Sequence, residues 1–197
     1  RVSYQLETLW DFDYAPTHQE LETLYETAKK NQWNGATAID WSRPVGASGQ
    51  LGVGVLSYKT TPAQVGTATT WAGVTAGYAS TCATRTDKTL WCWGDNGYGQ
   101  LGVGTTFQTA PVQVGTATTW STVNVSSSST CGSRTDGTLW CWGNNMAGQL
   151  GDGTTTHRST PTQVGTATAW TSTLVVNYHT CAVRTDASLW CWGDNAS

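Results

Sequence analysis

The sequence predicts an all-β protein made of three propeller-type blades, each a four-stranded antiparallel sheet, preceded by a short N-terminal arm with one amphipathic helix. The first observation is an internal repeat: TCATRTDKTLWCWGDN at 81–96 returns as TCGSRTDGTLWCWGNN at 130–145 and as TCAVRTDASLWCWGDN at 180–195. The second observation is that GQLGxG and then QVGTATxW precede each copy. A period of 49 or 50 residues is typical of propeller blades or solenoid units.

Residues 1–45 form the predicted arm, and their composition differs from that of residues 46–197, the predicted domain of three repeats of about 49 residues. The arm carries four basic and seven acidic residues, whereas the repeats carry six of each and no glutamate. Thr17 and Glu20 match a capping box, and apolar residues then recur at helical spacing. We therefore expect a helix at about 18–33, with an apolar face that packs on the repeats or on another chain.

Past Gly46 the pattern changes to short strands. The stretches WAGVTA, STCATRT and TLWCWG are rich in β-branched and aromatic residues and are bounded by Gly, Asp and Asn. A repeat of this length holds about four strands of five or six residues with their turns. Thr135, Asp136 and Gly137 are predicted to form a three-residue hairpin loop, with the glycine in the left-handed conformation. Lys88 and Ala187 stand at the glycine's position in the other copies and tolerate that conformation less well.

The same hairpin register places the two cysteines of each copy directly opposite one another, at a separation that suits a disulfide. The predicted disulfides join Cys82 to Cys92, Cys131 to Cys141, and Cys181 to Cys191. Each would close a short loop and stabilise the fold by about 2.5–3 kcal/mol. Buried reduced thiols are the alternative, whereas zinc is disfavoured because no CxxC spacing occurs. Disulfides would indicate an oxidising compartment.

The tryptophans are predicted to be core residues. Trp91 and Trp93 flank Cys92 at a period of two, and Trp71 adds a third indole to the repeat, so both faces of the strand are apolar. This arrangement is expected where blades stack on their neighbours. A row of indoles that binds sugar is the alternative interpretation.

Nothing in the sequence predicts a metal site or a cofactor. The repeated GDN or GNN raises calcium as an alternative, but the spacing is not that of an EF-hand loop, and these residues are ordinary turn formers. His18 and Glu22 lie four apart on the expected helix, which is an incomplete ligand set. His157 and His179 have no counterparts in the other repeats. The triplets beginning at Asn124 and Asn195 match the short glycosylation sequon.

The charge and the hydropathy of the sequence limit the kinds of partner that we expect for this chain. The repeats carry no basic stripe that would neutralise phosphates, so we expect no nucleic-acid partner. No run of 18 apolar residues predicts a membrane span.

The units GQLGxG, P-x-QVGT, W-x-x-V and TCAxRTDGxLWCWGDN resemble the repeat of the regulator-of-chromosome-condensation family over residues 46–197. This resemblance implies a β-propeller, usually of seven blades, whose members act as exchange factors for a small GTPase, as chromatin-binding scaffolds or as secreted bacterial binding proteins. The cysteine-rich and threonine-rich repeats here are similar to the bacterial extracellular members. The exchange-factor and chromatin roles are not carried over, because no long inserted loop and no basic face occur in this sequence.

The segment LWDFDYAPTHQELETLYETAKKNQWNGATAIDWS at 9–42 resembles the N-terminal arm of bacterial ferritin-like di-iron oxygenases. The rest of the chain departs from that family, because it offers no Glu-x-x-His pair on carboxylate-bearing helices. A di-iron centre is therefore not expected.

Three repeats are too few to close a propeller, which normally needs about four to eight blades. Open blade edges are expected to be covered by self-association, by a protein partner, or by further repeats if the 197 residues are a fragment of a longer propeller. We therefore predict a secreted or surface-exposed module that is not an enzyme and that binds protein or self-assembles. The alternative is an enzyme, a remnant of an oxygenase fusion, which bound iron and oxygen consumption would reveal.

Overall fold

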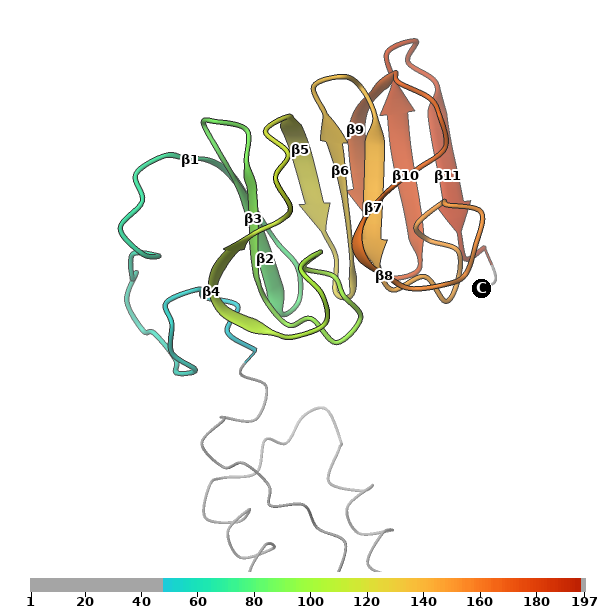
Figure 1. The fold of residues 1–197 in the computed structure, drawn as a ribbon. Coiled ribbons are helices and arrows are strands. Elements are labelled where there is room, and N and C mark those ends of the chain that lie inside the picture. The colour runs from blue at the N-terminus through green and yellow to red at the C-terminus, as the bar shows by residue number, and fades with distance from the viewer. Residues whose placement is uncertain (1–47, 196–197) are drawn as a thin grey trace, which may run out of the picture. The chain divides into compact units, whose positions relative to one another are not determined.

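The computed structural model describes residues 48–195 of the chain (Figure 1). The predicted arm at 1–45, its helix at about 18–33 and the oxygenase-like segment lie outside the described residues. So do His18, Glu22 and the last two residues of the sequon that begins at Asn195. Within the described part of the chain, no helix has the length and apolar character needed to cross a membrane.

The described residues form three antiparallel sheets, which confirms the all-β class and the division into blades. The first sheet has the order β1 (Trp71–Ala76), β2 (Ser80–Arg85), β3 (Leu90–Gly94) and β4 (Gln108–Gln113). The second has the order β5 (Trp120–Val125), β6 (Ser129–Arg134), β7 (Leu139–Gly143) and β8 (Arg158–Gln163). The third consists of β9 (Trp170–Val175), β10 (His179–Arg184) and β11 (Leu189–Gly193) among the described residues.

The fourth strand of each complete sheet comes from the start of the next repeat. β4 and β8 end at the glutamine of the second and third QVGT motifs, and they pair with β3 and β7. A sheet is therefore completed by residues that follow a GQLGxG loop. The third sheet has three strands because no described residue follows β11 in this way.

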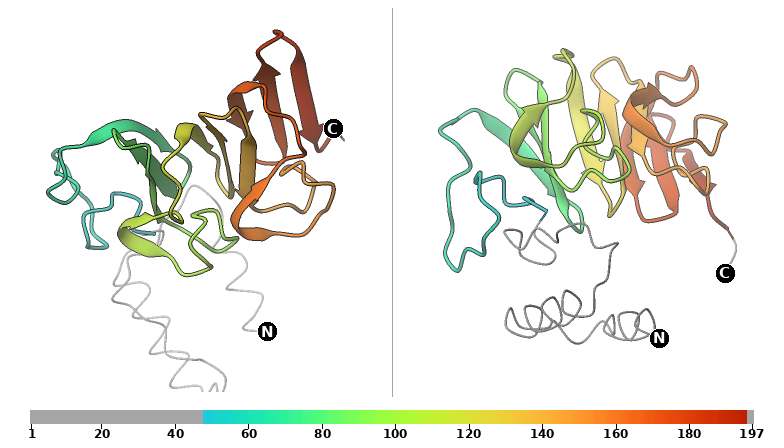
Figure 2. Two further views of the ribbon diagram at one scale, coloured as in Figure 1. Left: turned by 45° about the horizontal axis from the view of Figure 1, so that its top comes forward. Right: turned by 60° about the horizontal axis from the view of Figure 1, so that its bottom comes forward.

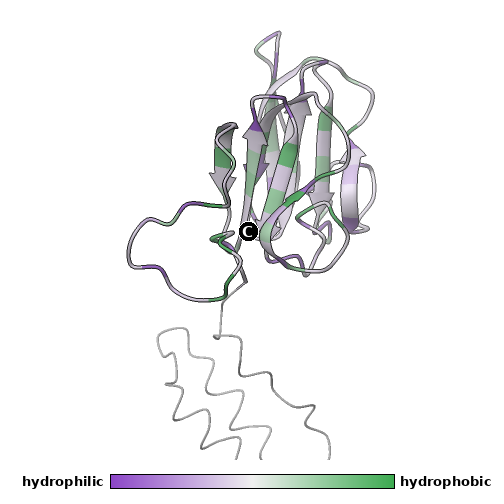
Figure 3. Ribbon diagram, turned by 60° about the vertical axis from the view of Figure 1, so that its left-hand side comes forward, coloured by the Kyte–Doolittle hydropathy of each residue, from purple (hydrophilic) through white to green (hydrophobic). Residues whose placement is uncertain are grey.

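The three sheets follow one another in chain order, and neighbouring sheets pack together (Figure 2). Strand β5 contacts β1 and β2 of the first sheet, and β9 contacts β5 and β6 of the second. Hydrophobic positions are spread over the strands of the sheets, beside hydrophilic ones (Figure 3). The core is thus formed both within the sheets and between them.

The hairpin loops have the register that the sequence predicts. Cys131 lies opposite Cys141, and the same alignment recurs in the other two hairpins. Gly137 has a φ of 76°, in the left-handed region. Lys88 and Ala187 adopt the same conformation, with φ values of 65° and 63°, so the shared register outweighs their local preference.

Replacement of Lys88 by glycine is expected to raise the free energy of unfolding by up to about 1 kcal/mol. Glycine has no Cβ to oppose a positive φ, and part of the gain is offset by the greater freedom of glycine in the unfolded chain. Urea denaturation measures the change. Ala187→Gly should act in the same direction, whereas Gly137→Ala should destabilise, because the new Cβ would overlap the Thr168 carbonyl. Equal effects of Lys88→Gly and Gly137→Ala would contradict this account.

Candidate interaction surface

The outer edge of β11 is the candidate interaction surface. β3 and β7 are covered on their outer edges by β4 and β8, while β11 pairs only with β10 among residues 48–195. The difference appears at one leucine of each repeat. Leu90 and Leu139 are fully buried, whereas Leu189 at the same position of β11 is 68% exposed. The edge therefore presents backbone groups and apolar side chains to solvent.

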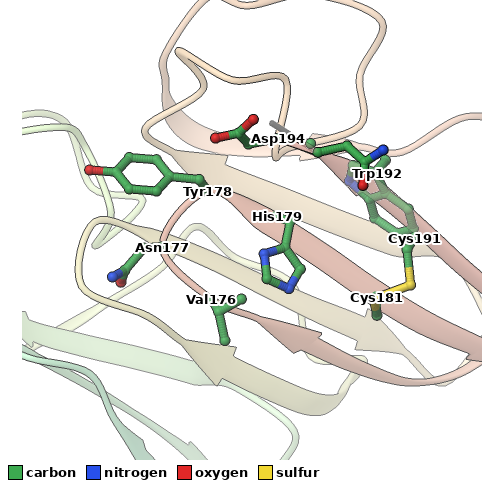
Figure 4. A pocket seen from close by; sticks show the side chains of 10 residues that line it. Val176, Asn177, Tyr178, His179, Cys181, Cys191, Trp192 and Asp194 are labelled. Atoms are coloured by element: carbon green, nitrogen blue, oxygen red, sulfur yellow. A yellow bond between two sulfur atoms is a disulfide. The ribbon is translucent and has the colours of Figure 1, made fainter. Parts of the chain in front are cut away.

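A hollow with a volume of about 900 Å³ lies beside this edge (Figure 4). The turn between β9 and β10, the first half of β10, the end of β11 and the residues after β11 form its wall. Its labelled lining residues are Val176, Asn177, Tyr178, His179, Cys181, Cys191, Trp192 and Asp194. The hollow is open and combines aromatic and polar groups with the sulfur atoms of a disulfide. Such a surface suits a protein segment better than a small molecule, because a small ligand is usually enclosed.

All six cysteines are joined in pairs across their hairpins. The S–S distances are 2.09 Å for Cys82 and Cys92, 2.11 Å for Cys131 and Cys141, and 2.12 Å for Cys181 and Cys191. The first two disulfides are fully buried and lie in core clusters with residues of the following sheet. The third lines the hollow instead, so it occupies the position that a following sheet would cover.

The tryptophans serve mainly as core residues. Trp120 and Trp142 are fully buried, with ring centroids 5.6 Å apart. Trp142 Nε1 donates a hydrogen bond of 2.9 Å to the Gln100 carbonyl oxygen, and Trp93 makes the same bond to Gln50. The sugar-platform alternative is not supported by these positions, because the buried indole faces are unavailable for stacking.

An arginine of each repeat lies against two indoles, a role that the sequence reasoning missed. The Arg134 guanidinium lies 3.8 Å from the centroid of Trp140 and 4.9 Å from that of Trp120. Arg85 and Arg184 make the equivalent contacts. A cation over an aromatic face is stabilising, and the fixed spacing between RTD and LWCWG is the signal that would have revealed it.

The asparagines of the GDN and GNN motifs organise the next loop. Asn96 is fully buried; its Oδ1 accepts a hydrogen bond from Leu101 N, and its Nδ2 donates to the carbonyl oxygens of Gly104 and Thr106. Asn145 makes the equivalent bonds to Leu150, Thr154 and Thr156. The side-chain amides of these asparagines bond to backbone groups of the next loop and hold that loop in place. This structural role accounts for the motif without a bound calcium ion. Within residues 48–195, no three His, Cys, Asp or Glu side chains gather in a way that would hold a metal ion.

The remaining candidate residues have separate positions. His157 Nδ1 accepts a hydrogen bond of 3.0 Å from the Asn145 backbone, and its ring lies against Tyr98. His179 is exposed on β10 and lines the hollow. Asn124 of the first sequon donates a hydrogen bond of 2.8 Å to the Thr173 carbonyl oxygen in the next sheet. The structure does not bring these residues together into one site.

The lowered pKa values of three aspartates in the hairpin loops lead us to expect that the protein loses stability in acid. The pKa of Asp136 lies below its ordinary value, because the Thr138 hydroxyl and then the Thr138 backbone N–H donate to its carboxylate. The pKa values of Asp87 and Asp186 are lowered in the same way, by the hydroxyl and then the backbone N–H of Thr89 and of Ser188. A lowered folded-state pKa gives stability that is complete above the unfolded value and is lost as the pH falls through the folded value.

We therefore expect the free energy of unfolding to decrease as the pH is lowered below about 4, which is the ordinary pKa of aspartate. Urea denaturation across the acid range measures this dependence. A variant with asparagine at positions 87, 136 and 186 should show a shallower acid slope, because asparagine retains an acceptor oxygen but does not titrate there. An unchanged slope in that variant would assign the acid sensitivity to other groups.

Comparisons with known proteins agree with this architecture. Two sequence profiles described as the Regulator of chromosome condensation (RCC1) repeat match the chain, one at 87–133 and 136–183, the other at 71–100, 120–149 and 175–197. A comparison with curated protein sequences finds no match.

Similar solved structures include human WBSCR16, with a TM-score of 0.58 and 18% identity over 62% of this chain and 33% of that one. Yeast RCC1 (Prp20) bound to Kap60 has a TM-score of 0.55 and 20% identity over 61% of this chain and 31% of that one. This chain thus spans about a third of the length of these proteins. At these identities the likeness concerns the fold, while the profiles cover the repeats themselves. The chain therefore belongs to the family of proteins built from RCC1 repeats.

Proposed function

We propose that this chain is a protein-binding module that is not an enzyme and that works outside the cell or on its surface. The observation that carries the proposal is the outer edge of β11, which pairs with no other strand among residues 48–195 and has Leu189 and Trp190 exposed on it. An exposed strand edge accepts an extended segment of another protein, since backbone hydrogen bonds give affinity and alternate side chains give specificity.

Two further observations support the proposal. The three disulfides are stable in an oxidising compartment, which favours a secreted or surface location. Protein binding also occurs among similar proteins: yeast RCC1 is bound to Kap60 in one structure, and Prp20p is described together with its binding properties to Gsp1p and histones. The partner of this chain is a separate question, because only the fold is similar at these identities.

A peptide that mimics the missing strand tests the proposal. The peptide RSTPTQVGT has the sequence of residues 158–166, which include β8. Titrated into a dilute solution of the chain, it is expected to bind β11 with micromolar affinity and to change the fluorescence of the exposed Trp190. The same peptide with proline in place of Val164 is the control, because it lacks the N–H that bonds to the Leu139 carbonyl oxygen in the second sheet. Equal signals from both peptides, or no signal from either, would exclude this edge as a binding site.

The compartment and the absence of catalysis have their own tests. Mass determination of the chain recovered from outside its producing cells should show six hydrogens fewer than the reduced form, as three disulfides require. Recovery only inside the cells, in reduced form, would refute the location. Stoichiometric bound iron together with oxygen consumption would instead favour the oxygenase alternative.

A further inference from the structure

The two junctions inside the chain contain the same buried apolar trio. Each trio consists of a leucine from the third strand of a sheet, the leucine of the next GQLGxG loop and the valine of the next QVGT motif. The trios are Leu90, Leu101 and Val114 in the first sheet, and Leu139, Leu150 and Val164 in the second. Five of these six side chains are no more than 1% exposed, and Val164 is 8% exposed. Burial of such a trio is therefore a regular feature of a completed sheet.

The chain contains the parts of a third trio, but they lie apart. Leu189 of β11 is 68% exposed, Leu51 of the first GQLGxG loop is 46% exposed, and Val65 of the first QVGT motif is only partly buried. Figure 1 shows β11 at one end of the row of sheets and the loop that contains Val65 at the other. A single copy with this arrangement does not bring the three residues together.

The segment before Val65 has the sequence of a fourth strand. Residues 59–64 read KTTPAQ, which matches RSTPTQ of β8 and QTAPVQ of β4, and all three segments continue as VGT. All six residues of 59–64 are exposed and form no strand, whereas β4 and β8 are mostly half-buried. The spacing from the glutamine of GQLGxG to the valine of QVGT is also the same for Gln50 to Val65 as for Gln149 to Val164. This segment therefore has the composition and the length to serve as a fourth strand.

The residues around the segment are already in place. The Gln50 carbonyl oxygen accepts hydrogen bonds from Trp93 Nε1 and Thr81 Oγ1, so the loop before the segment is docked on the first sheet. In the completed sheets, Val114 N donates to the Leu90 carbonyl oxygen and Val164 N to that of Leu139, each at 2.8 Å. The equivalent donor and acceptor in the other repeat are Val65 N and the Leu189 carbonyl oxygen, which lie at opposite ends of a single copy.

The first and the last sheet also have faces that complement each other. The buried disulfides of the first two sheets share core clusters with Trp120 and Trp170 of the sheets that follow. Trp71 is the equivalent residue of the first sheet and is only partly buried, while the Cys181–Cys191 disulfide lines the open hollow. The first sheet of one copy thus has the residues that would cover the last sheet of another.

We propose that copies of this chain assemble head to tail by strand addition, with residues 59–65 of one copy pairing with β11 of the next. The partner of the proposed binding edge is then a second copy, so this inference rests on the proposed protein-binding function. The contact unites Leu51 and Val65 of one copy with Leu189 of the other. Two such contacts would close a ring of two copies, and six blades lie within the range of about four to eight that propellers use.

The mass of the disulfide-bonded 197-residue chain in solution tests the assembly, measured by light scattering across a range of concentrations. Wild-type chain should form a dimer, or an open series of multiples if the ring does not close. Val65→Pro, which removes the backbone donor, and Leu189→Lys, which places a charge in the trio, should each reduce the mass toward that of a monomer. Met146→Lys is the matched control, because Met146 is 69% exposed but belongs to neither end.

Mixing the two monomeric variants gives a test of direction. Val65→Pro retains an intact β11 and Leu189→Lys retains an intact segment 59–65, so together they should form a dimer through one contact. Circular dichroism and intact mass establish that each variant is folded and disulfide-bonded. A wild-type monomer at high micromolar concentration, or a mixture that stays monomeric, would overturn the inference. Binding of the RSTPTQVGT peptide in that case would leave the protein-binding function standing, while its failure would remove both.

Discussion

Replacement of Trp142 by alanine is expected to lower the free energy of unfolding by about 3–5 kcal/mol. Trp142 is fully buried on β7, its ring packs against Trp120, and its Nε1 donates to the Gln100 carbonyl oxygen. The variant loses the buried indole area, leaves a cavity between two sheets, and leaves a carbonyl oxygen that retains only the Thr130 hydroxyl as a donor. Urea denaturation followed by circular dichroism measures the change.

Trp140 provides the matched control, because it lies two residues earlier on the same strand and is only partly buried. Its ring contacts Arg134 and packs against the margin of the core, and its Nε1 donates to the Thr138 hydroxyl, so Trp140→Ala removes marginal rather than fully buried contacts. The loss should be about half of that for Trp142→Ala. Equal losses would mean that packing between the sheets contributes less than the burial indicates.

Removal of the Cys131–Cys141 disulfide by double replacement with alanine is expected to cost about 3 kcal/mol. The bond closes a hairpin with a sequence separation of 10, and both cysteines are fully buried. Loss of the loop constraint accounts for most of the effect, and the poorer packing of alanine adds to it. Chemical denaturation of the double variant and of the wild type, both under oxidising conditions, measures the difference.

The Cys181–Cys191 disulfide is the control with the same sequence separation. Because it lines the open hollow, its removal should lose the loop constraint but little packing. It should also be the first to be reduced by a mild reductant under native conditions and at concentrations where the chain is monomeric, since exchange requires access to sulfur. Alkylation and peptide mapping identify which pair is reduced first. Earlier reduction of Cys131 and Cys141 would contradict the burial of that pair.

The disulfides, the arginine–tryptophan contacts and the buried asparagines act at different levels of one repeat. A disulfide joins the two strands of the hairpin at the centre of a sheet, as between Cys131 on β6 and Cys141 on β7. Arg134 ties the start of the loop to indoles on two strands. Asn145 holds the loop that precedes the fourth strand of the sheet. Together they hold the strands and loops of the repeat in place. The exposed edge of β11 and the largely exposed segment 59–65 then lie at the two ends of the described repeats, and both proposals rest on these ends.

Local features of the repeat could be predicted from the sequence, because they depend on residues close together in the chain. The alignment of Cys131 with Cys141 follows from the loop around Asp136, and the left-handed residue of that loop follows from Gly137. The core role of the tryptophans follows from their alternation with the cysteines. From the sequence the buried asparagines resemble ordinary turn formers, because their hydrogen-bond partners lie in the next loop and the motif does not specify the path of that loop.

The sequence by itself determined the repeat, its hairpins and the pairing of its cysteines, since each depends on a short and nearly invariant spacing. Only the tertiary structure decided where one blade ends and the next begins. A periodic sequence has no preferred starting point, and the bonds from β4 to β3 and from β8 to β7 span a loop that carries no strand pattern. In both complete sheets the fourth strand comes from the repeat that follows, so the edge of a sheet does not coincide with the boundary of a sequence repeat.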